Sequence, residues 1–173
     1  DAEVVFTTRY NRGLVGTRLA ELKEEEELTI RDLVGCVMVG SANDAAAVIA
    51  AHISGSQEAF VAQMNRYAEQ LGCTETNYTN VHGLHDENQY TTARDIAIMS
   101  RELITKYPKI EDYVTIWMED ITHVTSKGSS EFGLSNTNKL IRHYEYATGL
   151  KTGSTDEALF CVSATARKNH TLL

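Results

Sequence analysis

The sequence predicts an α+β protein in which a helical lobe is followed by antiparallel strands. Helix caps and helical apolar periodicity recur over residues 14–112 or so. From about residue 113 to residue 173 the chain is rich in Thr, Val, Tyr and Ile, and turn residues interrupt it at short intervals. No repeat or low-complexity linker divides the chain. We therefore expect a single domain over residues 1–173, with the helices preceding the strands.

The first predicted helix begins at a capping box. Thr29 and Asp32 have the Thr-x-x-Asp spacing ahead of an apolar run, and Gly40 is expected to end the helix. The preceding residues, 1–28, carry mixed signals, with a helix-like start and then a polar stretch. Their acidic run, 24–27, is most simply a solvated surface.

Two further helices are predicted next. Asn43 or Asp44 can cap a helix over residues 45–53, which Gly55 closes. Ser56 caps the following helix, which is amphipathic. Its apolar stripe consists of Phe60, Met64, Ala68 and Leu71.

A polar loop over residues 73–91 separates these helices from a fourth one. Thr92 and Asp95 cap that helix, which finishes before Pro108. The strand-like segments that follow are 113–126, 146–153 and 158–167, with turns at 127–128, 154–157 and 168–169. A last strand is expected to have just begun at Leu173.

Composition excludes several classes of partner. The net charge of -8 argues against nucleic acid and anionic membranes, because both require a basic face. No apolar run approaches the ~20 residues of a membrane span. Cys36, Cys73 and Cys161 are odd in number and far apart, so we expect small buried hydrophobes rather than disulfides or metal ligands.

Two short motifs could carry chemistry. Ser41 and Asn43 form a Ser-x-Asn elbow between two helices, where both side chains can point into a cleft, although capping is the simpler interpretation. Lys151 and Thr152 offer a cation and a hydroxyl to a carboxylate. Gly153 removes the Cβ that would hold a substrate backbone away. The alternative for this triplet is a strand end with a solvated lysine and a turn glycine.

Other catalytic or metal patterns are weak. His82, His85 and Asp86 lie in the polar loop without a third ligand at helical spacing, which favours a turn with solvent-facing imidazoles over a zinc site. No phosphate-binding glycine loop is present, and no Ser-His-Asp arrangement has supporting context. No serine in the chain is followed three positions later by lysine.

Beyond these motifs, the chain resembles the serine-type D-alanyl-D-alanine carboxypeptidases, the low-molecular-mass penicillin-binding proteins. The resemblance implies a β-lactamase/penicillin-binding transpeptidase-like α+β fold. It extends from about residue 14 to the C-terminus in consistent order. The blocks that carry it are residues 33–47, 55–61, 64–65, 71–72, 81–84, 90–95, 136–140 and 149–155.

The resemblance also implies a role for each motif residue. Ser41 would relay a proton to the leaving amine, and Asn43 would hydrogen-bond the substrate's peptide carbonyl. Lys151 would supply positive potential, while Thr152 would bind the substrate carboxylate. The backbone N–H of Ser154 would form half of an oxyanion hole.

The activity implied is acyl transfer through a serine ester on peptidoglycan stem peptides ending in D-Ala-D-Ala, outside the cytoplasm. Penicillins and other β-lactams would acylate the same serine. No metal or organic cofactor is implied, and no nucleic acid partner.

The missing Ser-x-x-Lys motif departs from the family pattern. We therefore expect an internal segment, incomplete at both ends, that is inactive alone. Its unpaired strand edges should make it marginally stable, self-associating, or complemented by another piece of chain. A class A β-lactamase is disfavoured, since the chain has Ser-Ala-Asn in place of Ser-Asp-Asn and lacks Glu-x-x-Leu-Asn. A peptidoglycan-binding module that has lost its nucleophile stays open as an alternative.

Overall fold

A computed structural model describes residues 3–169 and 171–172. Its helices precede its longest strands, so the α+β prediction is confirmed. In chain order the elements are β1 (Glu3–Val5), η1 (Thr8–Asn11), β2 (Glu27–Thr29), α1 (Ile30–Met38), α2 (Asn43–Ser54), α3 (Gln57–Gln70), α4 (Ala93–Lys106), η2 (Pro108–Ile110), α5 (Glu111–Val114), β3 (Met118–Thr125), β4 (Gly128–Ser135), α6 (Leu140–His143), β5 (Ala147–Thr155), β6 (Leu159–Lys168) and β7 (Thr171–Leu172).

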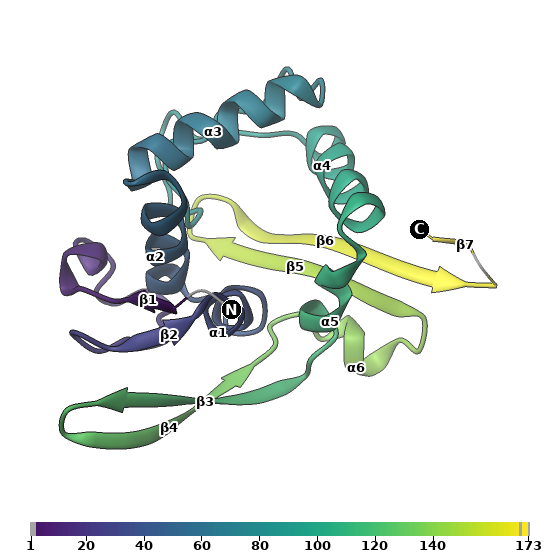
Figure 1. The fold of residues 1–173 in the computed structure, drawn as a ribbon. Helices are drawn as coiled ribbons and strands as arrows, with labels where there is room; N and C mark the ends of the chain where they lie inside the picture. Colours follow the sequence, from purple (N-terminus) through teal and green to yellow (C-terminus); the bar gives the residue numbers. More distant parts are fainter. Residues whose placement is uncertain (1–2, 170, 173) are drawn as a thin grey trace.

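The described residues contain three small antiparallel sheets. β1 pairs with β2, β3 with β4, and β5, β6 and β7 form the third sheet in that order. Figure 1 shows α3 and the β3–β4 hairpin at opposite ends of the molecule, with α2 and α4 on either side of it. The long β5–β6 ribbon crosses the middle.

The N-terminal segment differs from the prediction. Its helix-like start is a strand, β1, in which Val4 is buried opposite Leu28 of β2. The acidic run is not wholly solvated either, because Glu26 is fully buried. One carboxylate oxygen of Glu26 lies 2.7 Å from the Nδ1 atom of His123 in β3, and the other accepts from the backbone N–H of Lys23 at 2.8 Å. Burial of this carboxylate therefore depends on a partner 97 residues away.

The capping box of α1 is confirmed, since the Thr29 hydroxyl accepts from the backbone N–H of Asp32 and the Asp32 carboxylate accepts from that of Thr29. The prediction for α2 was partly wrong. It begins at Asn43, and its N-cap residue, Ala42, makes no side-chain capping bond. Asp44 instead directs its carboxylate to the segment before α1. Gly55 closes α2 with a φ of 80°, as expected.

The caps of the next two helices are confirmed. Ser56 accepts from the backbone N–H of Ala59 at the start of α3, and Thr92 accepts from that of Asp95 at the start of α4. The apolar stripe of α3 is less buried than expected, because only Ala68 is fully covered.

The strand region holds several corrections. Residues 111–114 form the short helix α5, so the strand expected from residue 113 begins only at Met118. β4 was not predicted, because its sequence, GSSEFGLS, lacks the β-branched residues that mark strands. β5 continues to Thr155, beyond the turn expected from Ser154. The prediction for Leu173 lies outside the described residues.

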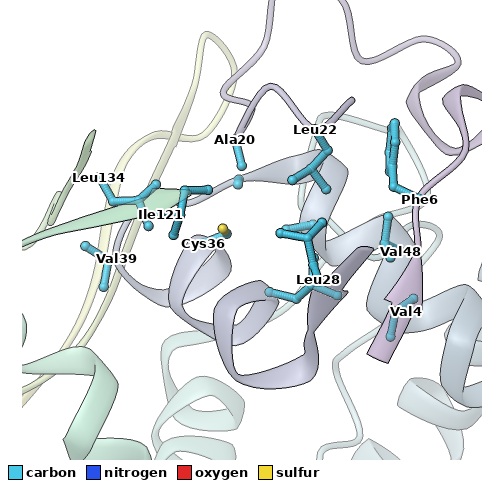
Figure 2. Packing of buried hydrophobic residues seen from close by; sticks show 13 residues of the cluster. Val4, Phe6, Ala20, Leu22, Leu28, Cys36, Val39, Val48, Ile121 and Leu134 are labelled. Carbon is cyan, nitrogen blue, oxygen red and sulfur yellow. The ribbon is translucent and has the colours of Figure 1, made fainter. Parts of the chain in front are cut away.

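One hydrophobic cluster joins the N-terminal segment, α1, α2 and the β3–β4 hairpin. Figure 2 shows it running from Ile121 and Leu134, beside Val39, to Phe6, beside Val48. Cys36 is fully buried in it, and burial with nearby carboxylates raises the pKa of its thiol to about 12. Cys73 is also buried, as expected. Cys161 is exposed, so that part of the prediction was wrong: its strand, β6, lies with this side chain uncovered.

Candidate active site

The elbow between α1 and α2 presents Ser41. Its φ is 58°, in the left-handed region that non-glycine residues rarely adopt. The preceding residue, Gly40, packs under the hairpin so closely that an added Cβ would lie 2.7 Å from the Leu134 side chain. The elbow is therefore fixed by tertiary contacts rather than by helix capping.

A buried carboxylate anchors the start of α2. Asp44 is fully buried, and its two oxygens accept from the backbone N–H groups of Ala20 and Leu22 at 2.9 and 3.2 Å. The backbone N–H of the neighbouring Asn43 donates to the carbonyl oxygen of Arg18 at 2.9 Å. These contacts hold the 18–22 segment against the elbow.

The second half of the site is β5. Leu150, the residue before Lys151, is buried in a small cluster with Ile104 of α4 and Val114 of α5. Met38, at the end of α1, packs against the same cluster. Because α1 and β5 share this cluster, the elbow and the Lys-Thr-Gly triplet lie beside each other.

The structure brings Ser41 and Lys151 into direct contact. The Nζ atom of Lys151 donates to the Ser41 hydroxyl at 2.7 Å and to the carbonyl oxygen of Thr152 at 2.9 Å. The alternative of a solvated lysine at a strand end is therefore wrong. Asn43, two positions after Ser41, is largely buried, at 9% exposed.

The charge state of Lys151 is perturbed. Burial is the main cause and the positive charge of Arg18 the second, and together they lower the pKa of Lys151 to about 8. Arg18 is exposed, and one of its guanidinium nitrogens lies 3.5 Å from the carbonyl oxygen of Gly40, next to Ser41. No motif in the sequence marks Arg18, which joins the site through the path of the 18–22 segment.

Thr152 meets a residue that the motif search missed. Its hydroxyl donates to the hydroxyl of Thr137 at 2.5 Å. Thr137 lies between β4 and α6, in one of the blocks that carry the resemblance, but nothing in its type or spacing marks it as a site residue. Only the three-dimensional path of the chain reveals it.

Gly153 and Ser154 are both exposed on β5. A Cβ built on Gly153 would meet no atom within 4 Å, so the space beside this backbone is open. β5 pairs with β6 along one edge, and its other edge has no strand partner among the described residues. Backbone N–H and C=O groups on such an edge can bind an extended peptide.

The histidine loop does not assemble a metal site in the part of the chain that the structure describes. No group of three or more His, Cys, Asp or Glu side chains is suitably placed there. His82 is half-buried rather than solvent-facing, and its ring nitrogen accepts from the backbone N–H of Leu84 at 3.3 Å. Burial lowers the pKa of His82. The Nδ1 atom of His85 lies 3.8 Å from a carboxylate oxygen of Glu157.

Among the described helices, none is long and apolar enough to cross a bilayer.

Known proteins share this fold. The crystal structure of the DD-transpeptidase from Streptomyces K15 superposes with a TM-score of 0.91 at 26% identity, covering 99% of this chain and 69% of that one. The fold is therefore that of the penicillin-binding DD-peptidases.

The sequence comparison narrows this class to one family. The profile described as D-alanyl-D-alanine carboxypeptidase matches residues 5–173, and the chain belongs to that family. Two relatives are the D-alanyl-D-alanine carboxypeptidases DacF of Bacillus subtilis, 36% identical over 169 residues, and DacC of Escherichia coli, 34% identical over 157 residues. The matches cover 98% and 90% of this chain, respectively, but only 42% and 37% of those proteins.

Proposed function

We propose that this chain forms one wall of the active site of a serine D-Ala-D-Ala carboxypeptidase, within a protein that also contains a Ser-x-x-Lys motif. The contact between Lys151 Nζ and Ser41 Oγ carries this proposal, because it unites the two motifs at hydrogen-bond distance. Two further findings support it: the chain belongs to the D-alanyl-D-alanine carboxypeptidase family, and it spans only 42% of the length of its Bacillus subtilis relative. None of the serines in the 173 residues has lysine three positions on, so the nucleophile comes from outside them.

The reaction has two steps. A serine oxygen attacks the carbonyl carbon between the two terminal D-alanines, the peptide C–N bond breaks, and the amine of D-alanine leaves with a proton. Water then attacks the ester and releases the shortened stem peptide. No metal or organic cofactor takes part.

Ser41 relays the proton to the leaving amine. Its hydroxyl accepts from Lys151 Nζ, so its own proton is free to point toward the substrate. The side-chain amide nitrogen of Asn43 donates a hydrogen bond to the substrate's peptide carbonyl.

Lys151 and Thr152 hold the terminal carboxylate, one by charge and the other by its hydroxyl. The substrate backbone lies along the free edge of β5, where Gly153 leaves room for it. The backbone N–H of Ser154 donates to the developing oxyanion, together with the N–H of the nucleophile.

The natural partners are peptidoglycan stem peptides ending in D-Ala-D-Ala, and β-lactams are covalent inhibitors. Because that polymer lies outside the cytoplasmic membrane, the protein works in an extracytoplasmic compartment.

The isolated chain self-associates. β6 leaves Leu159, Phe160 and Val162 at 67%, 94% and 59% exposed, although it pairs with β5 and β7. Such apolar side chains on a strand favour pairing with another copy. Sedimentation of residues 1–173 should give dimers or larger species, and a monomer at tens of micromolar would contradict this.

Fluorescent penicillin tests the function directly. The complete protein should be labelled covalently and should release D-alanine from a peptide ending in D-Ala-D-Ala, whereas residues 1–173 alone should show neither activity. Binding of the peptide without release or labelling would indicate a binding module instead. Labelling of the isolated chain would refute the claim that its nucleophile lies elsewhere.

A further inference from the structure

The hydroxyl pair of Thr137 and Thr152 lies outside the Ser41–Lys151 contact but borders it. Thr152 donates to Thr137 at 2.5 Å, and both side chains are half-buried. The carbonyl oxygen of Thr152 accepts from Lys151 Nζ at 2.9 Å, so a cation lies next to the pair. Two adjacent hydroxyls beside a cation make a site for an anion.

The loop that carries Thr137 is held on both sides. Asn136 is buried, and its amide nitrogen donates to the carbonyl oxygens of Val114 and Ile116 at 3.2 and 2.8 Å. Its amide oxygen accepts from the backbone N–H of Asn138 at 2.8 Å. The Thr137 hydroxyl is thus placed before any ligand arrives.

Asn138 fixes the other end of the loop. It is 2% exposed, and its amide oxygen accepts from the backbone N–H of Leu140 at 3.1 Å, at the start of α6. Both flanking asparagines turn inward, which leaves Thr137 to face β5. A side chain held in this way loses little conformational entropy on binding.

We propose that Thr137 is a positioning residue that orients the Thr152 hydroxyl toward the C-terminal carboxylate of the substrate. This inference rests on the proposed function and assigns it a further residue. Without substrate, the Thr152 proton points to Thr137. With a carboxylate bound, Thr152 donates to the carboxylate and accepts from Thr137, so the hydroxyls form a chain of two hydrogen bonds.

The chain of hydroxyls predicts a specific pattern of selectivity. A peptide ending in a free carboxylate uses both bonds, whereas the same peptide with a terminal carboxamide is a poor acceptor for them. Loss of Thr137 should therefore raise KM for the acid and leave the rate constant of the bound complex nearly unchanged.

The test uses the complete protein with an acylated tripeptide ending in D-Ala-D-Ala and with its C-terminal amide. Thr137→Val should raise KM for the acid by about 10-fold, since the Thr152 hydroxyl that donates to the carboxylate loses the donor that orients it. The amide should be affected by less than about 2-fold. Thr137→Ser keeps the hydroxyl and should restore the acid preference.

A double variant separates positioning from a merely structural role. Once Thr152→Val has removed the hydroxyl that Thr137 orients, adding Thr137→Val should cost nothing further. Additive losses would refute the inference. The matched control is Thr91→Val, which breaks another threonine pair, Thr76–Thr91 at 2.8 Å, and should leave the acid-to-amide ratio unchanged.

Failure of the inference differs from failure of the proposed function. If the wild-type protein releases D-alanine and Thr137→Val keeps its acid preference, Thr137 has no such role. If the wild type releases no D-alanine, the proposed function fails, and the two peptides then serve as equilibrium ligands. In that case Thr137→Val should change the ratio of the dissociation constants of the acid and the amide. An unchanged ratio would overturn the inference.

Discussion

Lys151 donates a 2.7 Å hydrogen bond to Ser41, although the two residues are 110 positions apart in the chain. The contact depends on packing beneath it, where Leu150 and Met38 share one cluster with α4 and α5. The strand and the helical elbow thus form one surface, on which each residue of the pair fixes the position of the other's side chain.

Removal of either partner should slow acylation of the complete protein. Ser41→Ala should reduce the rate of acylation by fluorescent penicillin by about 10²-fold or more, the scale of a lost proton relay. Lys151→Met should have a similar effect. Because the two residues act as a unit, the double variant should be little worse than either single one. Fully additive losses would show that the pair is not coupled.

The pH dependence of kcat/KM should report Lys151. Its pKa in the folded protein is about 8, so the cation is present below that pH and is lost above it. For a substrate with a free carboxylate, kcat/KM should therefore fall as the pH rises through about 8.

A second variant checks the cause of that pKa. Arg18→Gln removes a nearby positive charge that disfavours the lysine cation, so the falling limb should move to higher pH. Lys127→Gln, in the β3–β4 turn, removes the same charge away from the site and should leave the limb in place. An Arg18→Gln profile identical to that of the wild type would contradict this electrostatic assignment.

Alanine substitution at two glycines of β5 should have different effects on activity and stability. Gly153→Ala adds a Cβ that meets no protein atom within 4 Å, so thermal stability should be unchanged. That methyl group would occupy the space proposed for the substrate backbone, so it should slow D-alanine release by on the order of 10²-fold.

Gly149→Ala is the contrasting variant. Gly149 has a φ of 141°, and its new Cβ would lie 2.8 Å from a Val114 methyl group. This substitution should lower the melting temperature clearly. Equal stability of the two variants, or full activity of Gly153→Ala, would contradict the assignment of an open strand edge.

Asp44 should matter for stability rather than for chemistry. Asp44→Ala leaves the buried N–H groups of Ala20 and Leu22 without an acceptor, so the free energy of unfolding should fall by about 2 kcal/mol or more. The control is Asp86→Ala, at a half-buried aspartate whose carboxylate accepts from one backbone N–H, that of Asn88. Its effect should stay within about 0.5 kcal/mol. Urea denaturation measures both, and equal effects would refute the anchoring role.

Local signals explain what the sequence predicted well. The capping box at Thr29, the caps at Ser56 and Thr92, and the closing Gly55 act within a few residues, so they can be recognised in the sequence. The Lys-Thr-Gly and Ser-x-Asn motifs were equally visible, although their proximity followed only from the family resemblance.

Distant partners explain what the sequence could not predict. In the sequence, Glu26 belongs to an acidic run that is most simply solvated. In the structure its carboxylate lies 2.7 Å from the Nδ1 atom of His123 in β3. Thr137 has no local mark at all and joins the site because two buried asparagines turn it toward β5. The first strand was missed because apolar residues in a segment as short as β1 do not distinguish a strand from a helix.

The most direct measurement is the release of D-alanine from a peptide ending in D-Ala-D-Ala by the complete protein and by its Lys151→Met variant. The wild type should release D-alanine, prior treatment with penicillin should abolish the release, and the variant should be at least about 10²-fold slower at unchanged melting temperature. If the variant, folded and stable, releases D-alanine as fast as the wild type, the Ser41–Lys151 surface is not part of the active site.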